Sequence, residues 1–224
     1  MKIRLHLKIF IFIVIFILTR QIKIYGILMF FALLHELGHM LAGIILGFKP
    51  YSLEIMPLGL TISFKAKAEN YNKKIKKGTV LTLKKIIIAL AGPLTNIILI
   101  LIFYIFDFKF LIIERESVIY ANILIAIFNL IPIYPLDGGR IINGLLCIFY
   151  GRMKSYIYTN KISNICIILL TAISSIVILY LRNISILLIL VYLWYLVITE
   201  NKKFNSKRQI YELLDIPPFW CDNR

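Results

Sequence analysis

A pentapeptide near the start of the chain, His35-Glu36-Leu37-Gly38-His39, has the residue types and spacing of a metal-dependent hydrolase. Residues four apart lie on one face of a helix, so the two imidazoles can reach a single cation. Glu36 follows the first histidine, where a carboxylate can take a proton from a metal-bound water without being a ligand itself. The pattern indicates a zinc site that activates water.

The surroundings of this pentapeptide weaken the alternative that it arises by chance. The flanking residues 27–34 and 40–46 are almost entirely apolar. A charged side chain at the centre of a membrane costs about 2–3 kcal/mol unless it is bound or paired. Two histidines and a glutamate in such a stretch therefore favour a functional site.

The composition indicates an integral membrane protein, because 60% of the 224 residues are hydrophobic and the mean hydropathy is +0.87. A helix needs about 20 residues to cross a bilayer. Six segments meet this requirement roughly, at residues 3–19, 24–47, 83–106, 117–136, 162–181 and 184–199. The first could instead be a signal peptide, but residues 18–21 offer no small-residue cleavage site, so we expect an uncleaved helix.

The net charge of +15 reflects membrane orientation rather than nucleic-acid binding. With six crossings both termini lie on one side, and that side carries 21 of the 26 basic residues. Basic residues concentrate on the cytoplasmic side of membrane proteins. We therefore predict a multi-pass protein of the cell membrane with both termini in the cytoplasm, where the lysines can also contact anionic lipid.

A catalytic zinc site needs a third protein ligand and leaves its fourth position to water. The candidate is Asp137, which follows a stretch interrupted by Pro132 and Pro135 and precedes Gly138, where the backbone can approach a neighbour closely. Irregular backbone at membrane depth is tolerated where it is buried in protein or lines a wet cavity. A simple turn at the membrane interface is the alternative. The predicted site binds one zinc ion.

A third motif, Ala91-Gly92-Pro93-Leu94-Thr95-Asn96, lies early in the next predicted helix. Its small residues permit close helix packing, and the asparagine offers an amide for a hydrogen bond in the core. A packing motif with a proline kink is the favoured interpretation. We therefore expect Gly92 and Asn96 to support the site rather than to take part in the chemistry.

Together the sequences HELGH, AGPLTN and NLIPIYPLDGGR resemble the site-2 protease family of intramembrane zinc metalloproteases, in the order in which that family has them. The resemblance covers residues 30–140 and implies an all-α polytopic membrane fold. It implies that zinc is bound by His35, His39 and Asp137 and that Glu36 is the general base. It also implies substrate-binding roles for a second set, Asn129, Pro132 and Pro135.

Residues 51–67 alternate between apolar and polar side chains on both sides of a Met56-Pro57-Leu58-Gly59 turn, which predicts a β-hairpin. It resembles a membrane-associated hairpin of the family, whose edge can pair with an unwound substrate by strand addition. An ordinary cytoplasmic hairpin fits the pattern as well, and both remain open.

The predicted layout is a leader transmembrane helix at 1–20, a metalloprotease core at 21–140, two accessory transmembrane helices at 141–200 and a short cytoplasmic tail at 201–224. Neither the loop after the second helix nor the tail is long enough for a PDZ or a CBS domain. This plan looks most like the stage IV sporulation protein FB branch, which would imply cleavage of a pro-sigma factor.

The function expected from the sequence is hydrolysis of peptide bonds in a membrane-associated protein substrate, under the control of membrane regulatory proteins. Within the same class, the substrate could instead be an anti-sigma factor or a signal-peptide remnant. From other classes, a membrane metal transporter and a catalytically silent regulator compete with it. The three scattered cysteines include no C-x-x-C pair and receive no role.

Overall fold

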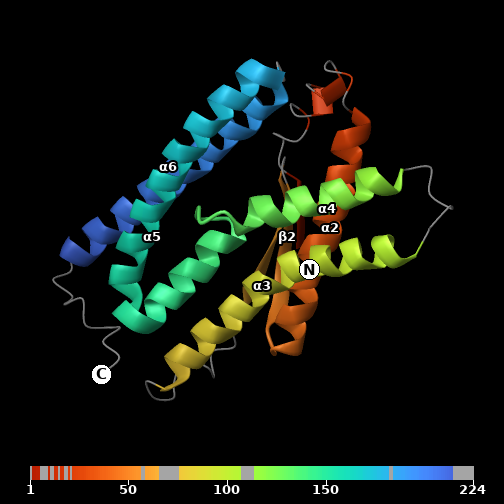
Figure 1. Ribbon diagram of the computed structural model, residues 1–224. Helices are drawn as coiled ribbons and strands as arrows, with labels where there is room; N and C mark the ends of the chain where they lie inside the picture. Colours follow the sequence, from red (N-terminus) through yellow and green to blue (C-terminus); the bar gives the residue numbers. More distant parts are fainter. Residues whose placement is uncertain are drawn as a thin grey trace. The chain divides into compact units, whose positions relative to one another are not determined.

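The computed structural model describes residues 2–5, 10, 13–14, 16–17, 20, 22–56, 59–65, 76–106, 114–181 and 184–213 (Figure 1). These residues form two compact units. The first comprises residues 1–77 and 87–129, and the second comprises residues 78–86 and 130–224. The all-helical fold with a short β-element that the sequence predicts is confirmed.

The first unit contains a three-stranded sheet in the order β1-β2-β3, formed by Lys2–Leu5, Lys49–Met56 and Gly59–Lys65. Strands β2 and β3 pair in antiparallel register from Lys49↔Lys65 to Met56↔Gly59, which confirms the predicted hairpin. Residues 57 and 58 of its predicted turn lie outside the described residues. Strand β1 pairs with β2 in parallel, although the sequence predicts a helix from about residue 3.

Helix α2, Ile22–Ile45, carries the HExxH pentapeptide and ends in a glycine cap. Gly47 has a φ of 86°, which favours glycine because a Cβ would be strained there. The N–H of Gly47 donates to the carbonyl of Ile44 and the N–H of Phe48 to that of Gly43, each at 2.9 Å, which is the Schellman pattern. The cap turns the chain directly into β2.

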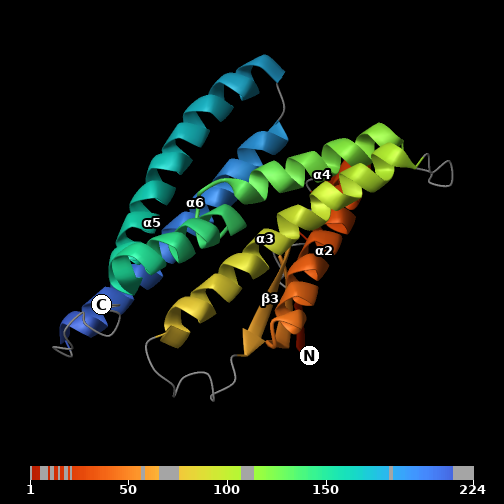
Figure 2. The ribbon, with the colours of Figure 1, turned by 60° about the horizontal axis from the view of Figure 1, so that its bottom comes forward.

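The sheet packs against the last turns of α2, and Figure 2 shows β3 beside that helix. At Gly43 of α2 the absence of a side chain makes room for the aromatic ring of Phe64 on β3, which a Cβ would overlap. Phe64 also lies edge-to-face against Phe48, with ring centroids 6.2 Å apart. Apolar contacts thus fix the sheet one helical turn beyond the pentapeptide.

Most of helix α3, Lys76–Ile105, and of helix α4, Arg115–Leu130, completes the first unit, whereas residues 78–86 of α3 and residue 130 belong to the second. Phe31 of α2 packs with buried side chains of α4 in the hydrophobic core, namely Val118, Ala121 and Ile125. Phe31 also makes an edge-to-face contact with Phe103 of α3. This core aligns α2 with α3 and α4 one turn before His35.

The second unit is built from helices α5, Asp137–Leu181, and α6, Ile184–Leu213. Gly151 interrupts α5 with a φ of 78°, and beyond it α5 lies beside α6, as Figure 2 shows. Short hydroxyl side chains of α5 are buried, namely Ser155, Thr159 and Ser163. Asn164 of α5 and Asn201 of α6 are joined by a hydrogen bond of 3.0 Å.

Among the described residues, three helical segments are long and apolar enough to cross a membrane: Ile22–Ile45, Thr79–Ile105 and Lys154–Val177. They agree with three of the six predicted crossings. The predicted crossing at 117–136 is wrong at its carboxyl end, because α4 stops at Leu130 before the two prolines. Helix α6 begins at the predicted residue 184 but continues to Leu213, so the start of the predicted tail is helical.

Candidate metal centre

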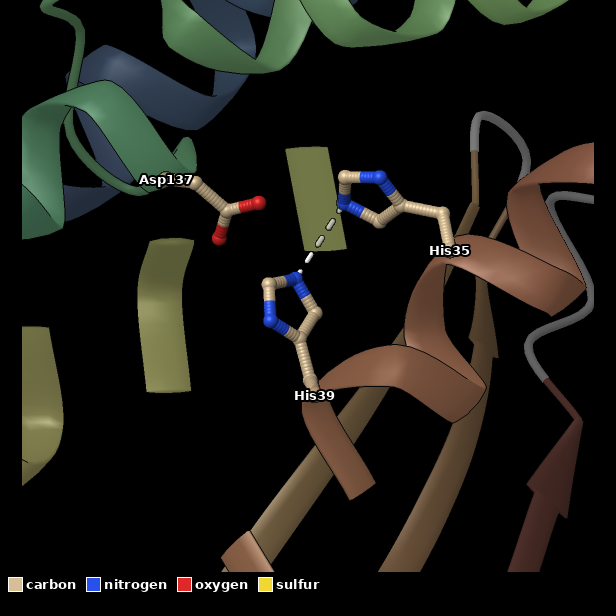
Figure 3. A group of neighbouring side chains, drawn as sticks. All are labelled: His35, His39 and Asp137. Carbon is tan, nitrogen blue, oxygen red and sulfur yellow. Dashed lines mark hydrogen bonds between the residues drawn. The ribbon is translucent and has the colours of Figure 1, made fainter. Parts of the chain in front are cut away.

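Helix α2 buries the three polar residues of its pentapeptide side by side. His35, Glu36 and His39 are 5%, 7% and 3% exposed. The imidazole planes of the two histidines are at right angles to each other, and Nε2 of His35 lies only 3.2 Å from Nε2 of His39 (Figure 3). The helical spacing predicted from the sequence therefore directs both rings at one point.

Each imidazole is held through its other nitrogen by a group on α3. Nδ1 of His35 lies 3.0 Å from Oδ1 of Asn96, and Nδ1 of His39 lies 2.6 Å from the backbone carbonyl of Ile88. Both partners are oxygen acceptors, so each Nδ1 donates the hydrogen of its neutral ring. Both Nε2 atoms then carry lone pairs, which is the arrangement of metal-binding histidines.

With both rings neutral, the 3.2 Å separation of the two Nε2 atoms is not an ordinary hydrogen bond, because neither ring then has a proton to place there. Two facing lone pairs repel each other unless a cation or a proton lies between them. Two nitrogens bound at about 2.0–2.1 Å to one tetrahedral zinc lie about 3.3 Å apart, close to the separation observed. The geometry of the pair suits zinc.

Gly92 of α3 leaves space beside the two nitrogens. A Cβ at this position would overlap Cε1 and Nε2 of His39 and would lie 2.6 Å from Nε2 of His35. The glycine therefore keeps a position free that is within coordination distance of both imidazoles. Since no larger residue fits there, Gly92 acts on the space beside the two imidazoles by its shape rather than by any donor atom.

Glu36 is placed to act next to the histidine pair. Its Oε2 lies 4.0 Å from Nε2 of His39, and the side chain is buried. At this distance the carboxylate can exchange a proton with a small molecule held at the two nitrogens.

Asp137 opens helix α5 in the second unit and is 4% exposed. A carboxylate in the first turn of a helix is favoured by the helix dipole. Arg140, one turn further, approaches its Oδ1 to 3.6 Å. Gly138 permits the tight loop before this helix, because a Cβ there would overlap the carbonyl of Leu130 and lie 2.6 Å from that of Ile131.

One ligand atom from each of His35, His39 and Asp137 can be chosen so that all three lie within 4.8 Å of one another (Figure 3). Two imidazole nitrogens and one carboxylate oxygen form the type of donor set that catalytic zinc sites use, with the fourth position left to water. The residues present therefore fit a zinc ion, as the sequence predicts.

The remaining predicted residues lie around the end of α4. Asn129, in its last turn, donates from Nδ2 to the carbonyl of Ile125 at 3.0 Å. Pro132 and Pro135 are half-buried in the non-helical segment that follows, and the Tyr134-Pro135 peptide bond is cis. Their predicted role in substrate binding stays a prediction.

Sequence reasoning missed the carbonyl of Ile88 as a partner of His39. Pro93 is a partial signal, because it lacks the N–H that would bond to the carbonyl of Ala89, four residues earlier, and its ring disturbs the turn that also contains Ile88. Ile88 lies in that turn, and its carbonyl accepts from His39.

The fold and the site define a mostly helical membrane protein with a buried HExxH metal centre. The sequence model of Peptidase family M50 matches residues 24–112 and 116–173. The chain therefore belongs to Peptidase family M50, and the predicted resemblance to the site-2 proteases is confirmed.

Two curated proteins are similar to parts of the chain. Zinc metalloprotease MJ0392 of Methanocaldococcus jannaschii is 32% identical over 130 residues, which are 54% of this chain and 34% of that protein. Stage IV sporulation protein FB of Bacillus subtilis is 27% identical over 151 residues, which are 63% of this chain and 46% of that protein. The matched region thus spans less than half of either relative.

A solved structure covers more of the chain. The Site-2 Protease from Methanocaldococcus jannaschii has a TM-score of 0.64 and 26% sequence identity to it, over 88% of this chain and 89% of the other. The helical membrane fold is therefore shared over nearly the full length of both.

Proposed function

We propose that this protein is an intramembrane zinc endopeptidase that hydrolyses peptide bonds of a membrane-associated protein. The observation that carries the proposal is the buried pair His35 and His39, whose Nε2 atoms face each other at 3.2 Å with the Glu36 carboxylate beside them. Membership of Peptidase family M50 and the likeness to a zinc metalloprotease support zinc as the metal.

In this proposal His35, His39 and Asp137 hold the ion. Zinc supplies a nucleophilic water near neutral pH and polarises the substrate carbonyl. Glu36 takes a proton from the attacking water and passes it to the leaving amine, which makes it general base and then general acid. The apolar residues of α2 exclude bulk water, so the Glu36 carboxylate acts in a medium of low dielectric constant where its charge has a strong effect.

A helical substrate must unwind before its carbonyls are accessible to a nucleophile, and an unwound strand needs partners for its backbone. The sheet of the first unit offers them by strand addition. Strand β2 already has β1 on one side and β3 on the other, so the substrate would pair at β1 or β3. Asn129, Pro132 and Pro135 are proposed to hold the strand near the metal.

The distribution of buried charge favours a hydrolase over a metal transporter. Of the side chains whose burial the structure describes, the buried histidines and acids are His35, Glu36, His39 and Asp137. In this proposal all four belong to one centre. A transport route would require further polar groups along its length across the membrane.

The proposals on membrane topology, domain layout and substrate are based on the sequence. We propose six crossings with both termini in the cytoplasm, and the layout of leader helix, core, accessory helices and tail given above. The likeness to Stage IV sporulation protein FB supports a role in sporulation, with a pro-sigma factor as substrate and membrane proteins as regulators. An anti-sigma factor or a signal-peptide remnant is the alternative substrate.

The direct test is Glu36→Gln, which removes the base but keeps the size and burial of the side chain. The purified variant should bind zinc with the affinity of the parent and lose cleavage of a co-expressed membrane substrate by a factor of about 100 or more. The matched control is Glu200→Gln, a carboxylate on α6 that pairs with Lys203. Retained proteolysis in Glu36→Gln would exclude the assigned base.

A further inference from the structure

Asn96 of α3 is completely buried between two other helices of the first unit. Its Oδ1 lies 3.0 Å from Nδ1 of His35 on α2, and its Nδ2 donates to the backbone carbonyl of Asn122 on α4 at 3.3 Å. The amide therefore bridges a histidine of the metal centre to the backbone of a helix that carries no ligand.

This bridge fixes the position of protons. The carbonyl of Asn122 can only accept, so the end of the Asn96 amide that faces it must be the NH₂ group. The other end is then the oxygen, which also can only accept. His35 must donate from Nδ1, and the lone pair of its neutral ring is left on Nε2, which faces His39.

We propose that Asn96 is a positioning residue that fixes His35 in the tautomer with its lone pair on Nε2 and holds the ring at the angle that metal binding requires. The inference rests on the proposed zinc site and extends it. It gives the motif at residues 91–96, which the sequence suggests for helix packing, a role in metal affinity. The backbone of α4 sets the orientation of the amide, so the effect originates in a helix outside the centre.

A packing role alone does not explain an asparagine here. A leucine has the same branched arrangement of heavy atoms and would occupy the position without the cost of burying an amide. An aspartate would accept from Nδ1 as well, but its charge would face the carbonyl of Asn122. Only a neutral side chain with one acceptor and one donor satisfies both neighbours.

Asn122 provides an internal contrast. It is also completely buried, and its Nδ2 donates to the carbonyl of Val118 in its own helix at 2.9 Å. Its Oδ1 has no hydrogen-bond partner among the described residues, and its side chain forms no bond with a histidine. Only its backbone carbonyl serves the bridge, so a substitution of the side chain leaves the acceptor for Asn96 in place.

The experiment compares Asn96→Leu with Asn122→Leu in the full-length protein in detergent. Zinc affinity is measured by competition with a chromophoric chelator, and the visible spectrum of the Co²⁺-loaded protein reports the ligand geometry. Loss of a hydrogen-bond partner of a metal-binding histidine typically weakens metal affinity by about 10–100-fold. We expect this loss and an altered Co²⁺ spectrum for Asn96→Leu, and affinity within about twofold of the parent for Asn122→Leu.

Asn96→Ala and Asn96→Asp are measured beside them, so that the comparison does not depend on one variant folding. Alanine removes the acceptor without adding bulk and should behave like leucine. Aspartate keeps the acceptor and should recover most of the zinc affinity. Parent-like affinity in both Asn96→Leu and Asn96→Ala, or an equal loss in Asn122→Leu, would overturn the positioning role.

Because zinc affinity is measured without substrate, the outcome is separate from the proposed proteolysis. A parent protein that binds zinc in an Asn96-dependent way but cleaves no substrate would refute the peptidase and leave the positioning role intact. A parent that cleaves its substrate while Asn96→Leu keeps full zinc affinity would support the peptidase and refute the positioning role.

Discussion

The hydroxyl of Ser163 accepts the backbone N–H of Tyr134 at 2.9 Å, although the two residues are 29 positions apart. Ser163 lies in α5 beyond the Gly151 interruption and is 2% exposed. Tyr134 belongs to the non-helical segment that leads into Asp137 three residues later. Helix α5, beyond its interruption, thus holds the segment that leads into Asp137.

Ser163→Ala should therefore impair catalysis more than its small size suggests. The N–H of Tyr134 would lose its partner, at a cost of about 1–3 kcal/mol for a buried donor, and the segment before Asp137 would shift to find another acceptor. We expect turnover to fall by about tenfold with a smaller change in zinc affinity. Ser175→Ala is the control, because that hydroxyl is exposed and bonds to carbonyls of its own helix. Equal turnover in the two variants would contradict the prediction.

Gly92→Ala should abolish metal binding without unfolding the protein. The added methyl group would occupy the space beside the two Nε2 atoms that the glycine keeps free. Elsewhere in a helix the same substitution stabilises by about 0.5–1 kcal/mol, because alanine loses less conformational entropy. Gly26→Ala on α2, where a Cβ would meet nothing within 4 Å, provides that reference.

Zinc content after equilibration and thermal unfolding distinguish the two glycine variants. Gly26→Ala should retain zinc and unfold at the same or a slightly higher temperature. Gly92→Ala should lose zinc while keeping its helical circular dichroism. A Gly92→Ala protein with full zinc content would show that the space is not needed for the metal.

Gly38, inside the pentapeptide, marks a close contact between α2 and α3. A Cβ there would overlap Oγ1 of Thr95 and would lie 3.1 Å from the carbonyl of Ala91. We expect Gly38→Ala to destabilise the protein by about 1–3 kcal/mol, the usual cost of overpacking. Thr95→Ala should relieve part of this cost, because it removes the overlapping hydroxyl.

The double variant Gly38→Ala with Thr95→Ala completes a double-mutant cycle. The coupling should be favourable by about 0.5 kcal/mol or more if the two positions touch. Unfolding in mixed micelles gives the four stabilities. Strictly additive changes in the free energy of unfolding would mean that α2 and α3 move apart at this point, so that the two side chains no longer touch.

The sequence predicts the parts of this protein that depend on local pattern. The HExxH spacing, the hairpin alternation and the prolines after Leu130 each act through neighbours in the chain, so periodicity and backbone chemistry are enough to place them. The fold class follows from them and is confirmed by the structure, and the two imidazoles lie together as the spacing predicts.

Contacts between distant segments could not be predicted in the same way. Nothing local to residues 2–5 distinguishes a strand from the start of an apolar helix, since its partner β2 lies almost 50 residues away. Asn96 and Gly92 have the composition of a packing motif, and only the position of α3 against α2 brings them to the imidazoles. Their contact with the imidazoles therefore depends on tertiary packing and not on the local sequence.

Substitutions of Asp137, the proposed carboxylate ligand, and of its ion-pair partner Arg140 should have different effects on metal binding. Asp137→Asn keeps the shape of the side chain but loses the negative charge, so zinc affinity should fall by about 100-fold or more if Asp137 is a ligand. Arg140 lies 3.6 Å from the same carboxylate and its side chain is 39% exposed, so solvent screens its charge and weakens the pair. Arg140→Gln should therefore leave zinc affinity within a few-fold of the parent.

Chelation should inactivate the parent and Arg140→Gln alike, and added zinc should restore both while Asp137→Asn stays inactive. Similar zinc affinities for Asp137→Asn and Arg140→Gln would show that the third ligand is another residue.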